Sequence, residues 1–211
     1  MSVATTVLQV QGLGFGYPRH PPLWADWSAR LAPGVSWVRG GDGRGKTTLL
    51  RVLAGDVPAS AGRLQLHGVD LQGDAQAYRR QVFWVDPQTT VFDPMTALDY
   101  FRTLAAGYPA LDLPGCLALA AELSLQPHLE KPLYMLSTGS KRKVWLAAAF
   151  ASGAALTLLD TPFAALDKAS AALVRELLEE AAGHGTRAWV VADTDWPAAS
   201  LALAGTLDLG D

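Results

Sequence analysis

The stretch Gly40-Gly41-Asp42-Gly43-Arg44-Gly45-Lys46-Thr47 decides the fold class of this chain. It fits the pattern G-x-x-x-x-G-K-[ST] and follows an apolar segment, residues 35–39, that is expected to be a strand. A helix is expected to begin at Lys46. Glycines in such a turn let successive backbone N–H groups converge on a phosphate, the helix N-terminus adds its dipole, and the lysine neutralises phosphate oxygens. The sequence therefore predicts a phosphate-binding loop in which the Thr47 hydroxyl can take a position on Mg²⁺.

Apolar segments and helical segments alternate along the rest of the chain. Strands are expected at residues 7–11, 13–17, 24–31, 35–39, 63–67, 81–85, 156–159 and 188–192. Helices are expected at residues 46–55 and 168–182, and helical character dominates from about residue 96 to 152. This alternation favours an α/β fold with a parallel sheet and a helical insertion between roughly residues 90 and 152. Because no linker composition divides the chain, we expect one domain of residues 1–211.

The composition is that of a compact globular protein, since half of the 211 residues are apolar and 18% are charged. Seventeen basic against twenty acidic residues give a net charge of −3, so we expect no nucleic-acid partner. The single cysteine, Cys116, and a start without a signal-peptide pattern favour a reducing, cytoplasmic compartment. The uncharged run at residues 144–159 is shorter than the about 18 residues that a membrane-spanning helix needs.

An acidic residue follows the buried strand expected at residues 156–159. Asp160 then lies where the carboxyl ends of parallel strands face a ligand crevice, and a carboxylate there can hold Mg²⁺ through water. The alternative is that Asp160 caps the helix of the segment that follows. Asp160 and Thr47 are therefore candidate magnesium residues.

Further motifs give the chain a resemblance to a known family. Residues 40–48, GGDGRGKTT, resemble the Walker A motif of the ATP-binding cassette (ABC) ATPases, the nucleotide-binding subunits of ABC transporters. Tyr17 in FGYP is similar to the family's adenine-stacking aromatic, and Gln88 in VDPQ is similar to its Q-loop glutamine. The sequence Leu136-Ser137-Thr138-Gly139-Ser140 is similar to the LSGGQ signature, and Asp167 in ALD is similar to the D-loop. The resemblance covers nearly all of the chain. It implies a P-loop NTPase (RecA-like) core with a parallel sheet, an N-terminal antiparallel β portion and an inserted helical subdomain.

The resemblance also implies a role for each of these residues. Nucleotide would be bound by Tyr17, Gly40, Gly41, Asp42, Gly43, Arg44, Gly45, Lys46, Thr47 and Thr48. Mg²⁺ would be held by Thr47, Gln88 and Asp160, and the ATP of a second chain would be contacted by Ser137, Thr138, Gly139 and Ser140. Simpler roles stay open for three of these residues. Tyr17 can be an ordinary strand aromatic, and Gln88 can be a solvated loop residue. Ser137 can be the N-cap of the helix that follows, and it can fill this role while it also contacts the ATP of a second chain.

The chain departs from the family pattern at two catalytic positions. Thr161 follows the Walker B aspartate, where the family usually has a glutamate that polarises the attacking water. Thr194 stands where a histidine usually contacts the γ-phosphate. Smaller departures are Asp42, Arg44, Thr138 and Ser140. General-base catalysis contributes about 10²–10⁴ in rate, whereas the groups that bind phosphate and Mg²⁺ are intact, so we expect ATP binding with weak hydrolysis.

In this family two cassettes dimerise head to tail, so each ATP lies between one chain's Walker motifs and the other chain's signature. The resemblance thus implies the ATP-binding subunit of an ABC transporter, using ATP and Mg²⁺ and bound to a membrane permease at the cytoplasmic face of the membrane. The departures favour the degenerate half of a heterodimer. One alternative is a slow homodimeric ATPase that uses Asp193, Asp195 or the substrate phosphate to activate water. Another is an ATP-gated scaffold or regulatory module without a transport role.

Coupling to the permease would pass through a groove near Gln88. The candidate apolar contacts there are Phe92, Met95, Tyr100 and Phe101. At helical spacing such residues are also typical of a buried core.

Overall fold

The computed structural model describes residues 6–193 and 201–210. Within these residues, a five-stranded parallel sheet of order β6-β7-β8-β3-β9 lies at the centre of the fold. Its strands are β3 (Gly34–Arg39), β6 (Val82–Trp84), β7 (Leu156–Asp160), β8 (Ala188–Ala192) and β9 (Gly205–Asp208). The apolar strands β3, β7 and β8 are almost wholly buried, as parallel strands covered on both faces should be. The predicted parallel sheet is confirmed, and the sequence prediction misses only its edge strand β9.

An antiparallel sheet from the N-terminal part of the chain lies beside the parallel one. Its four described strands pair in the order β2-β1-β4-β5, and they are β1 (Leu8–Phe15), β2 (Trp24–Leu31), β4 (Ala61–Leu66) and β5 (Val69–Asp70). Residues 7–11 and 13–17, expected as two strands, contribute to the single strand β1. Gly12 has a φ of 59°, and the pairing with β2 shifts register around it without ending the strand. The antiparallel portion that the resemblance implies is therefore present.

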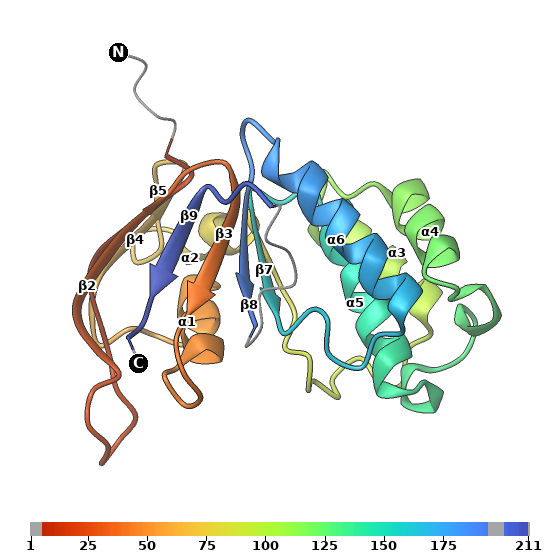
Figure 1. The fold of residues 1–211 in the computed structure, drawn as a ribbon, viewed down its shortest axis with the longest axis horizontal. Coiled ribbons are helices and arrows are strands. Elements are labelled where there is room, and N and C mark those ends of the chain that lie inside the picture. Colours follow the sequence, from red (N-terminus) through yellow and green to blue (C-terminus); the bar gives the residue numbers. More distant parts are fainter. Residues whose placement is uncertain (1–5, 194–200, 211) are drawn as a thin grey trace.

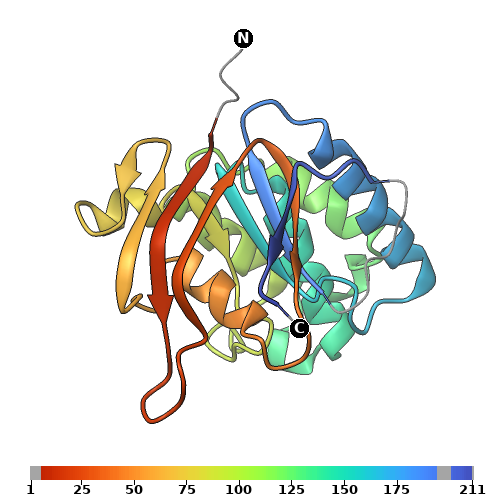
Figure 2. The same cartoon turned by 60° about the vertical axis from the view of Figure 1, so that its left-hand side comes forward.

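Helix α1 (Lys46–Leu53) lies between the two sheets, where Figures 1 and 2 show it in orange. Leu49, Leu50 and Leu53 are fully buried in a cluster that includes side chains of both sheets. Leu158 and Val190 bring one face of the parallel sheet into this cluster. Because the loop that precedes α1 continues from β3, this packing fixes the loop at the carboxyl edge of the parallel sheet.

The larger helices cover the opposite face of the parallel sheet, on the right in Figure 1. They are α3 (Ala97–Gly107), α4 (Leu113–Glu122), α5 (Thr138–Ala151) and α6 (Lys168–Ala182), and the short α2 (Ala75–Arg79) contacts β5 and β6. Single 3₁₀ turns at Gln126–His128 and Leu133–Met135 separate α4 from α5. Trp37 and Trp189 of the sheet share one buried cluster with Trp145 of α5. In the part of the chain that the structure describes, no helix is both long and apolar enough to cross a membrane.

Two of the four candidate permease contacts belong to this core. Tyr100 and Phe101 on α3 are fully buried, and the Tyr100 ring lies 4.8 Å from the Trp145 ring. The partly buried Phe92 packs against the same cluster. The prediction that Tyr100 and Phe101 contact a membrane subunit is therefore wrong, because the apolar stripe of α3 faces α5.

Candidate functional site

The glycine-rich loop joins the carboxyl end of β3 to the start of α1. Gly40, Gly43 and Gly45 have φ angles of 157°, 76° and 87°. A Cβ at Gly45 would lie 2.9 Å from Leu23 Cδ1 and 3.0 Å from Trp24 Cζ2, so a side chain there would have to displace both of these neighbours. No side chain caps α1, which leaves its first backbone N–H groups available to an anion.

Lys46 folds over the loop to which it belongs. Its Nζ donates to the carbonyl oxygens of Gly40 at 2.8 Å and Gly41 at 3.0 Å. A phosphate would add the attraction of opposite charges to a hydrogen bond from this ammonium group, so it would compete well with the two neutral carbonyl oxygens. Asp42 and Arg44, two of the departures from the family pattern, are exposed in the same loop.

Thr47 and Asp160 meet at the carboxyl edge of the parallel sheet. Thr47 Oγ1 donates to Asp160 Oδ2 at 2.7 Å, which joins the first turn of α1 to the end of β7. Burial raises the pKa of Asp160, while the Thr47 hydrogen bond and the charge of Arg142 act in the opposite direction. Asp160 is not a helix cap, because the next described helix, α6, is capped by Asp167. A hydroxyl beside a carboxylate is a set of oxygen donors that suits Mg²⁺.

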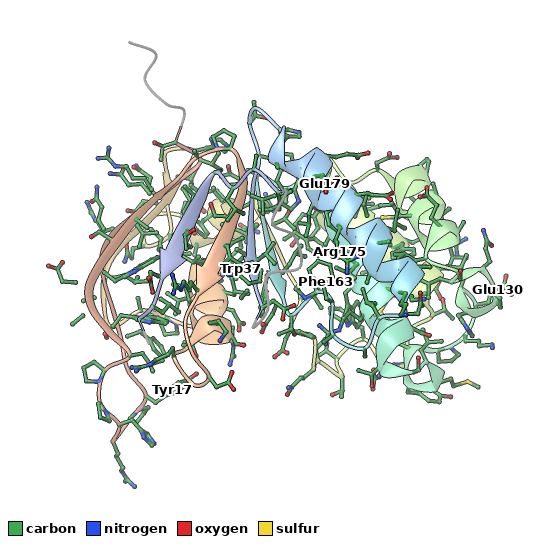
Figure 3. All side chains as sticks on the ribbon, viewed as in Figure 1. Tyr17, Trp37, Glu130, Phe163, Arg175 and Glu179 are labelled. Carbon is green, nitrogen blue, oxygen red and sulfur yellow. The ribbon has the colours of Figure 1, made fainter. Side chains whose placement is uncertain are left out.

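Tyr17 lies just beyond the end of β1 and reaches α1. Its hydroxyl shares a hydrogen bond of 2.9 Å with Thr48 Oγ1, and its ring meets Phe15 edge to face at a centroid distance of 5.1 Å. The side chain is 45% exposed, and Figure 3 places it at the same end of the molecule as the loop before α1. A ring tethered at its hydroxyl and half exposed is suited to stacking on a flat ligand group.

Residue 161 is held by a cation from α5. Thr161 has a φ of 44°, which is uncommon for a β-branched residue, and its N–H donates to Ala192 O at 2.6 Å. Nη1 of Arg142 donates to Asp160 O at 3.1 Å, to Thr161 O at 2.5 Å and to Thr161 Oγ1 at 3.2 Å. Burial lowers the pKa of Arg142, and the carboxylates of Asp160 and Asp193 oppose this effect. Position 161 therefore carries a hydrogen-bonded hydroxyl in place of a carboxylate base.

Other predicted site residues lie apart from this centre. Gln88 is exposed in a turn after β6, where its backbone N–H donates to Asp86 Oδ1 at 2.8 Å. Within residues 6–193, no hydrogen bond joins the Gln88 side chain to Thr47 or Asp160. Thr194, at the predicted switch position, lies outside the described residues.

The signature-like segment begins α5. Ser137 is the N-cap, and its Oγ accepts from Ser140 N at 3.1 Å, so the capping role expected of Ser137 is observed. Ser137 and Thr138 are exposed, and the positive end of the α5 dipole therefore faces outward. Gly139 packs against the backbone of Ala165, where an added Cβ would overlap the carbonyl oxygen. Gly139 thus has a packing reason within its own chain, in addition to any contact with a partner.

Sequence reasoning misses three consecutive cations that follow this segment. Lys141 Nζ donates to Asp93 Oδ1 at 2.5 Å, and Lys143 Nζ donates to Asp167 Oδ2 at 2.6 Å. With Arg142, each cation ties α5 to a different loop. Cations near a helix N-terminus oppose the helix dipole, so three in succession signal that acceptors from other segments lie nearby.

Comparisons with known proteins agree with this geometry. Residues 28–164 match a family model described as ABC transporter. The chain is 32% identical over 193 residues to the cytochrome c biogenesis ATP-binding export protein CcmA of Aromatoleum aromaticum, covering 90% of this chain and 89% of that protein. It is 34% identical over 174 residues to the taurine import ATP-binding protein TauB of Pseudomonas fluorescens, covering 82% of this chain and 66% of that protein.

Solved structures share the fold. One described as the ATP-binding subunit of an ABC transporter has a TM-score of 0.79 at 23% identity, covering 89% of this chain and 79% of that one. Another is a dimeric ATP-binding cassette in a post-hydrolysis state, bound to ADP and Pi. It has a TM-score of 0.75 at 20% identity and covers 89% of this chain and 88% of that one. The two sheets and the helices are thus arranged as in a P-loop NTPase of this kind.

Proposed function

Because the chain belongs to the ABC transporter family as an ATP-binding subunit, we propose that it binds Mg-ATP at the loop before α1 and hydrolyses it slowly at this site. The observation that carries the proposal is the bond of 2.7 Å between Thr47 and Asp160, beside a loop in which Gly45 has a φ of 87° and packs closely against Leu23 and Trp24. Binding groups are in place, and the neighbouring residue 161 has no carboxylate.

The residues around the loop fit a nucleotide triphosphate and its metal. The first N–H groups of α1 and the Lys46 ammonium group would donate to phosphate oxygens, and the half-exposed Tyr17 ring would stack on the adenine ring. Thr47 and Asp160 are the residues that would hold Mg²⁺, with Gln88 joining them if its turn moves inward. When bound, Mg²⁺ neutralises charge on the β- and γ-phosphate oxygens.

Slow turnover follows from the chemistry of position 161. A threonine hydroxyl does not accept a proton at neutral pH, and Thr161 Oγ1 already accepts a hydrogen bond from Arg142. General-base assistance contributes about 10²–10⁴ in rate, so its loss lowers hydrolysis while leaving the donors for ATP unchanged.

One observation favours a slow homodimeric ATPase as the second candidate. Asp193 follows β8, and its charge shifts the pKa of both Asp160 and Arg142, which indicates that its carboxylate lies near the site. A homodimer in which Asp193 activates water would hydrolyse ATP in the absence of any other cassette. Turnover by the pure chain that disappears in Asp193→Asn would support this candidate over the heterodimer.

In the proposed heterodimer, the N-terminal end of α5 contacts the ATP of the second cassette. The exposed first turn of α5, with Ser137 as its cap, presents backbone N–H groups and a positive dipole end. We place the γ-phosphate of a second cassette's ATP against this turn. The partner's site would then be complete, although this chain's own site turns over slowly.

The permease contact is proposed at exposed apolar residues beside the Gln88 turn, in place of the buried Tyr100 and Phe101. Val91, Tyr134 and Met135 are 76%, 64% and 60% exposed. They lie on two adjoining segments, because Tyr134 N donates to Asp93 O at 3.1 Å. Exposed apolar side chains gathered beside the Gln88 turn suit a protein partner. Val91→Asp combined with Met135→Asp is expected to abolish co-purification of the permease, whereas Leu203→Asp, at an exposed apolar residue elsewhere, should leave it intact.

The deciding experiment is a gentle detergent pull-down of the tagged chain from its native membranes, with ATP binding and hydrolysis measured on the same material. A permease and a second cassette that carries a glutamate after its Walker B aspartate would support the heterodimer. A permease with this chain alone would support the slow homodimer. Nucleotide binding without any membrane protein would favour the scaffold role, and absence of nucleotide binding would overturn the proposal.

A further inference from the structure

Arg142 lies one turn into α5, between two cations that bind elsewhere. Lys141 pairs with Asp93, in the segment after the Gln88 turn, and Lys143 pairs with Asp167, which caps α6. Arg142 alone among the three reaches the end of β7. The guanidinium is half-buried, and it donates to two backbone carbonyls and one hydroxyl of residues 160 and 161.

These bonds immobilise the turn that follows β7 from one side. On the other side, Thr161 N donates to Ala192 O of β8 at 2.6 Å. The turn is thus bound both to the sheet and to α5, and it holds Thr161 at a φ of 44°. A β-branched residue persists in this region only where surrounding contacts determine the backbone, and the bonds of Arg142 to Asp160 O and Thr161 O are such contacts.

The Asp160 side chain depends on the same backbone. Its carbonyl oxygen accepts from Arg142 at 3.1 Å, and its carboxylate accepts from Thr47 at 2.7 Å. Fixing the carbonyl fixes the orientation of the peptide unit, and so the direction in which the carboxylate leaves β7. Residues that orient a metal-binding side chain in this way change metal affinity by about 10–100-fold when they are replaced.

We propose that Arg142 is a positioning residue for Mg²⁺ binding: it anchors the backbone of Asp160 and Thr161 and thereby holds the Asp160 carboxylate toward Thr47. The inference rests on the proposed function, since it concerns the metal that accompanies ATP. The residue that orients the Asp160 carboxylate would then lie on α5, the helix that carries the signature-like segment, and outside the Walker motifs.

The test compares Arg142→Gln with Lys141→Gln in the full chain. Lys141→Gln breaks the neighbouring ion pair on the same helix turn without touching residues 160–161. ATP affinity is measured with Mg²⁺ and again with EDTA. We expect Arg142→Gln to reduce the enhancement by Mg²⁺ about tenfold while affinity in EDTA stays as in the wild type. Lys141→Gln should keep the full enhancement.

A readout without nucleotide or metal accompanies this measurement. Amide hydrogen exchange of the peptide that covers residues 158–163 should be faster in Arg142→Gln than in Lys141→Gln. If Arg142→Gln does not fold, Arg142→Lys replaces it. A lysine keeps the charge and carries three N–H donors on one nitrogen, but its side chain is shorter than that of arginine, so the loss of enhancement should be smaller and in the same direction.

Two outcomes separate the inference from the proposed function. Wild-type enhancement by Mg²⁺ in the Arg142 variants, with unchanged exchange at residues 158–163, would overturn the positioning role of Arg142. Absence of ATP binding in the wild-type chain under both conditions would overturn the proposed function itself, and the exchange comparison would still decide whether Arg142 anchors the turn.

Discussion

The two walls of the candidate ATP site are held in place by different means. The glycine loop is fixed by its own backbone and by α1, whose leucines are buried between two sheets. The wall formed by Asp160 and Thr161 is fixed by hydrogen bonds, several of them from the single side chain of Arg142. The capacity to bind phosphate is therefore built into the packing of the core. Under the proposed function, hydrolysis depends on a few side chains of the second wall, so it can weaken in a chain whose loop still binds phosphate.

The largest effect is expected on the loop wall. Lys46→Ala removes the cation nearest the phosphate position, and a hydrogen bond between charged groups contributes about 1.5–3 kcal/mol, so ATP affinity should fall about 100-fold. The measurement is titration calorimetry with Mg-ATP. Arg44→Ala, at an exposed position of the same loop, is the control and should bind normally. Equal losses in both variants would mean that general charge, and not the position of Lys46, governs binding.

The next effect tests whether the loop wall is part of the core packing. Gly45→Ala combines a positive φ of 87° with contacts of 2.9 and 3.0 Å to Leu23 and Trp24, and it should cost about 2 kcal/mol. For a domain of this size the melting temperature would fall by about 4–8 °C. Gly43→Ala has a φ of 76° but no atom within 4 Å of the added Cβ, so its loss should be about half as large. A thermal melt in which Gly43→Ala is the more damaging would contradict the packing argument.

A smaller effect, a gain in ATP turnover, is expected from a change in the wall formed by Asp160 and Thr161. Thr161→Glu restores a carboxylate, but the guanidinium of Arg142 lies 3.2 Å from the present hydroxyl and would lower the pKa of the new side chain. We expect turnover of the assembled complex to rise about tenfold, below the 10²–10⁴ typical of a free general base. Thr161→Gln, which lacks the base, should give no rise. A complex in which Thr161→Glu is no faster than Thr161→Gln would exclude the missing base as the cause of slow hydrolysis.

The smallest effect concerns the tether of Tyr17. Tyr17→Phe removes the hydroxyl that is bonded to Thr48 and keeps the ring, so ATP affinity should fall only about two- to threefold. Tyr17→Ala, which also removes the stacking surface, should lose about tenfold. Fluorescence of a labelled ATP analogue measures both. Identical affinities for Tyr17→Phe, Tyr17→Ala and the wild type would mean that Tyr17 is an ordinary strand aromatic.

The sequence predicts the glycine loop correctly because the loop's conformation depends on residues that are close together in the chain. Glycines, a lysine and a threonine at fixed spacing between a strand and a helix determine where backbone donors point. The same holds for Ser137, since an N-cap is defined within four residues. The parallel sheet follows from apolar segments that are short and continuous.

The other wall was only partly within reach because its contacts join residues far apart in the chain. Arg142 meets Thr161 across 19 positions, and Lys141 meets Asp93 across 48. Spacing predicts that Tyr100 shares a face of α3 with other apolar residues, but it does not show which neighbour covers that face, so a surface and a core position stay equally open until the burial of Tyr100 and Phe101 is seen. Edge strand β9 has a short and only partly apolar sequence, so its own pattern does not predict a strand. Its parallel pairing with β3 stabilises it as one.

The contact between Gly139 and Ala165 changes what a glycine in the signature-like segment can be taken to indicate. A side chain at Gly139 would overlap the carbonyl oxygen of Ala165, so the loop that contains Ala165 can keep its present position only with glycine at this site. Ser140 is also tied within its own chain, because its Oγ accepts from Ser137 Oγ at 3.0 Å and its N–H donates to Ser137 Oγ at 3.1 Å. A glycine at position 139 therefore reports on the folding of a single chain, and its presence alone is no evidence that the chain dimerises.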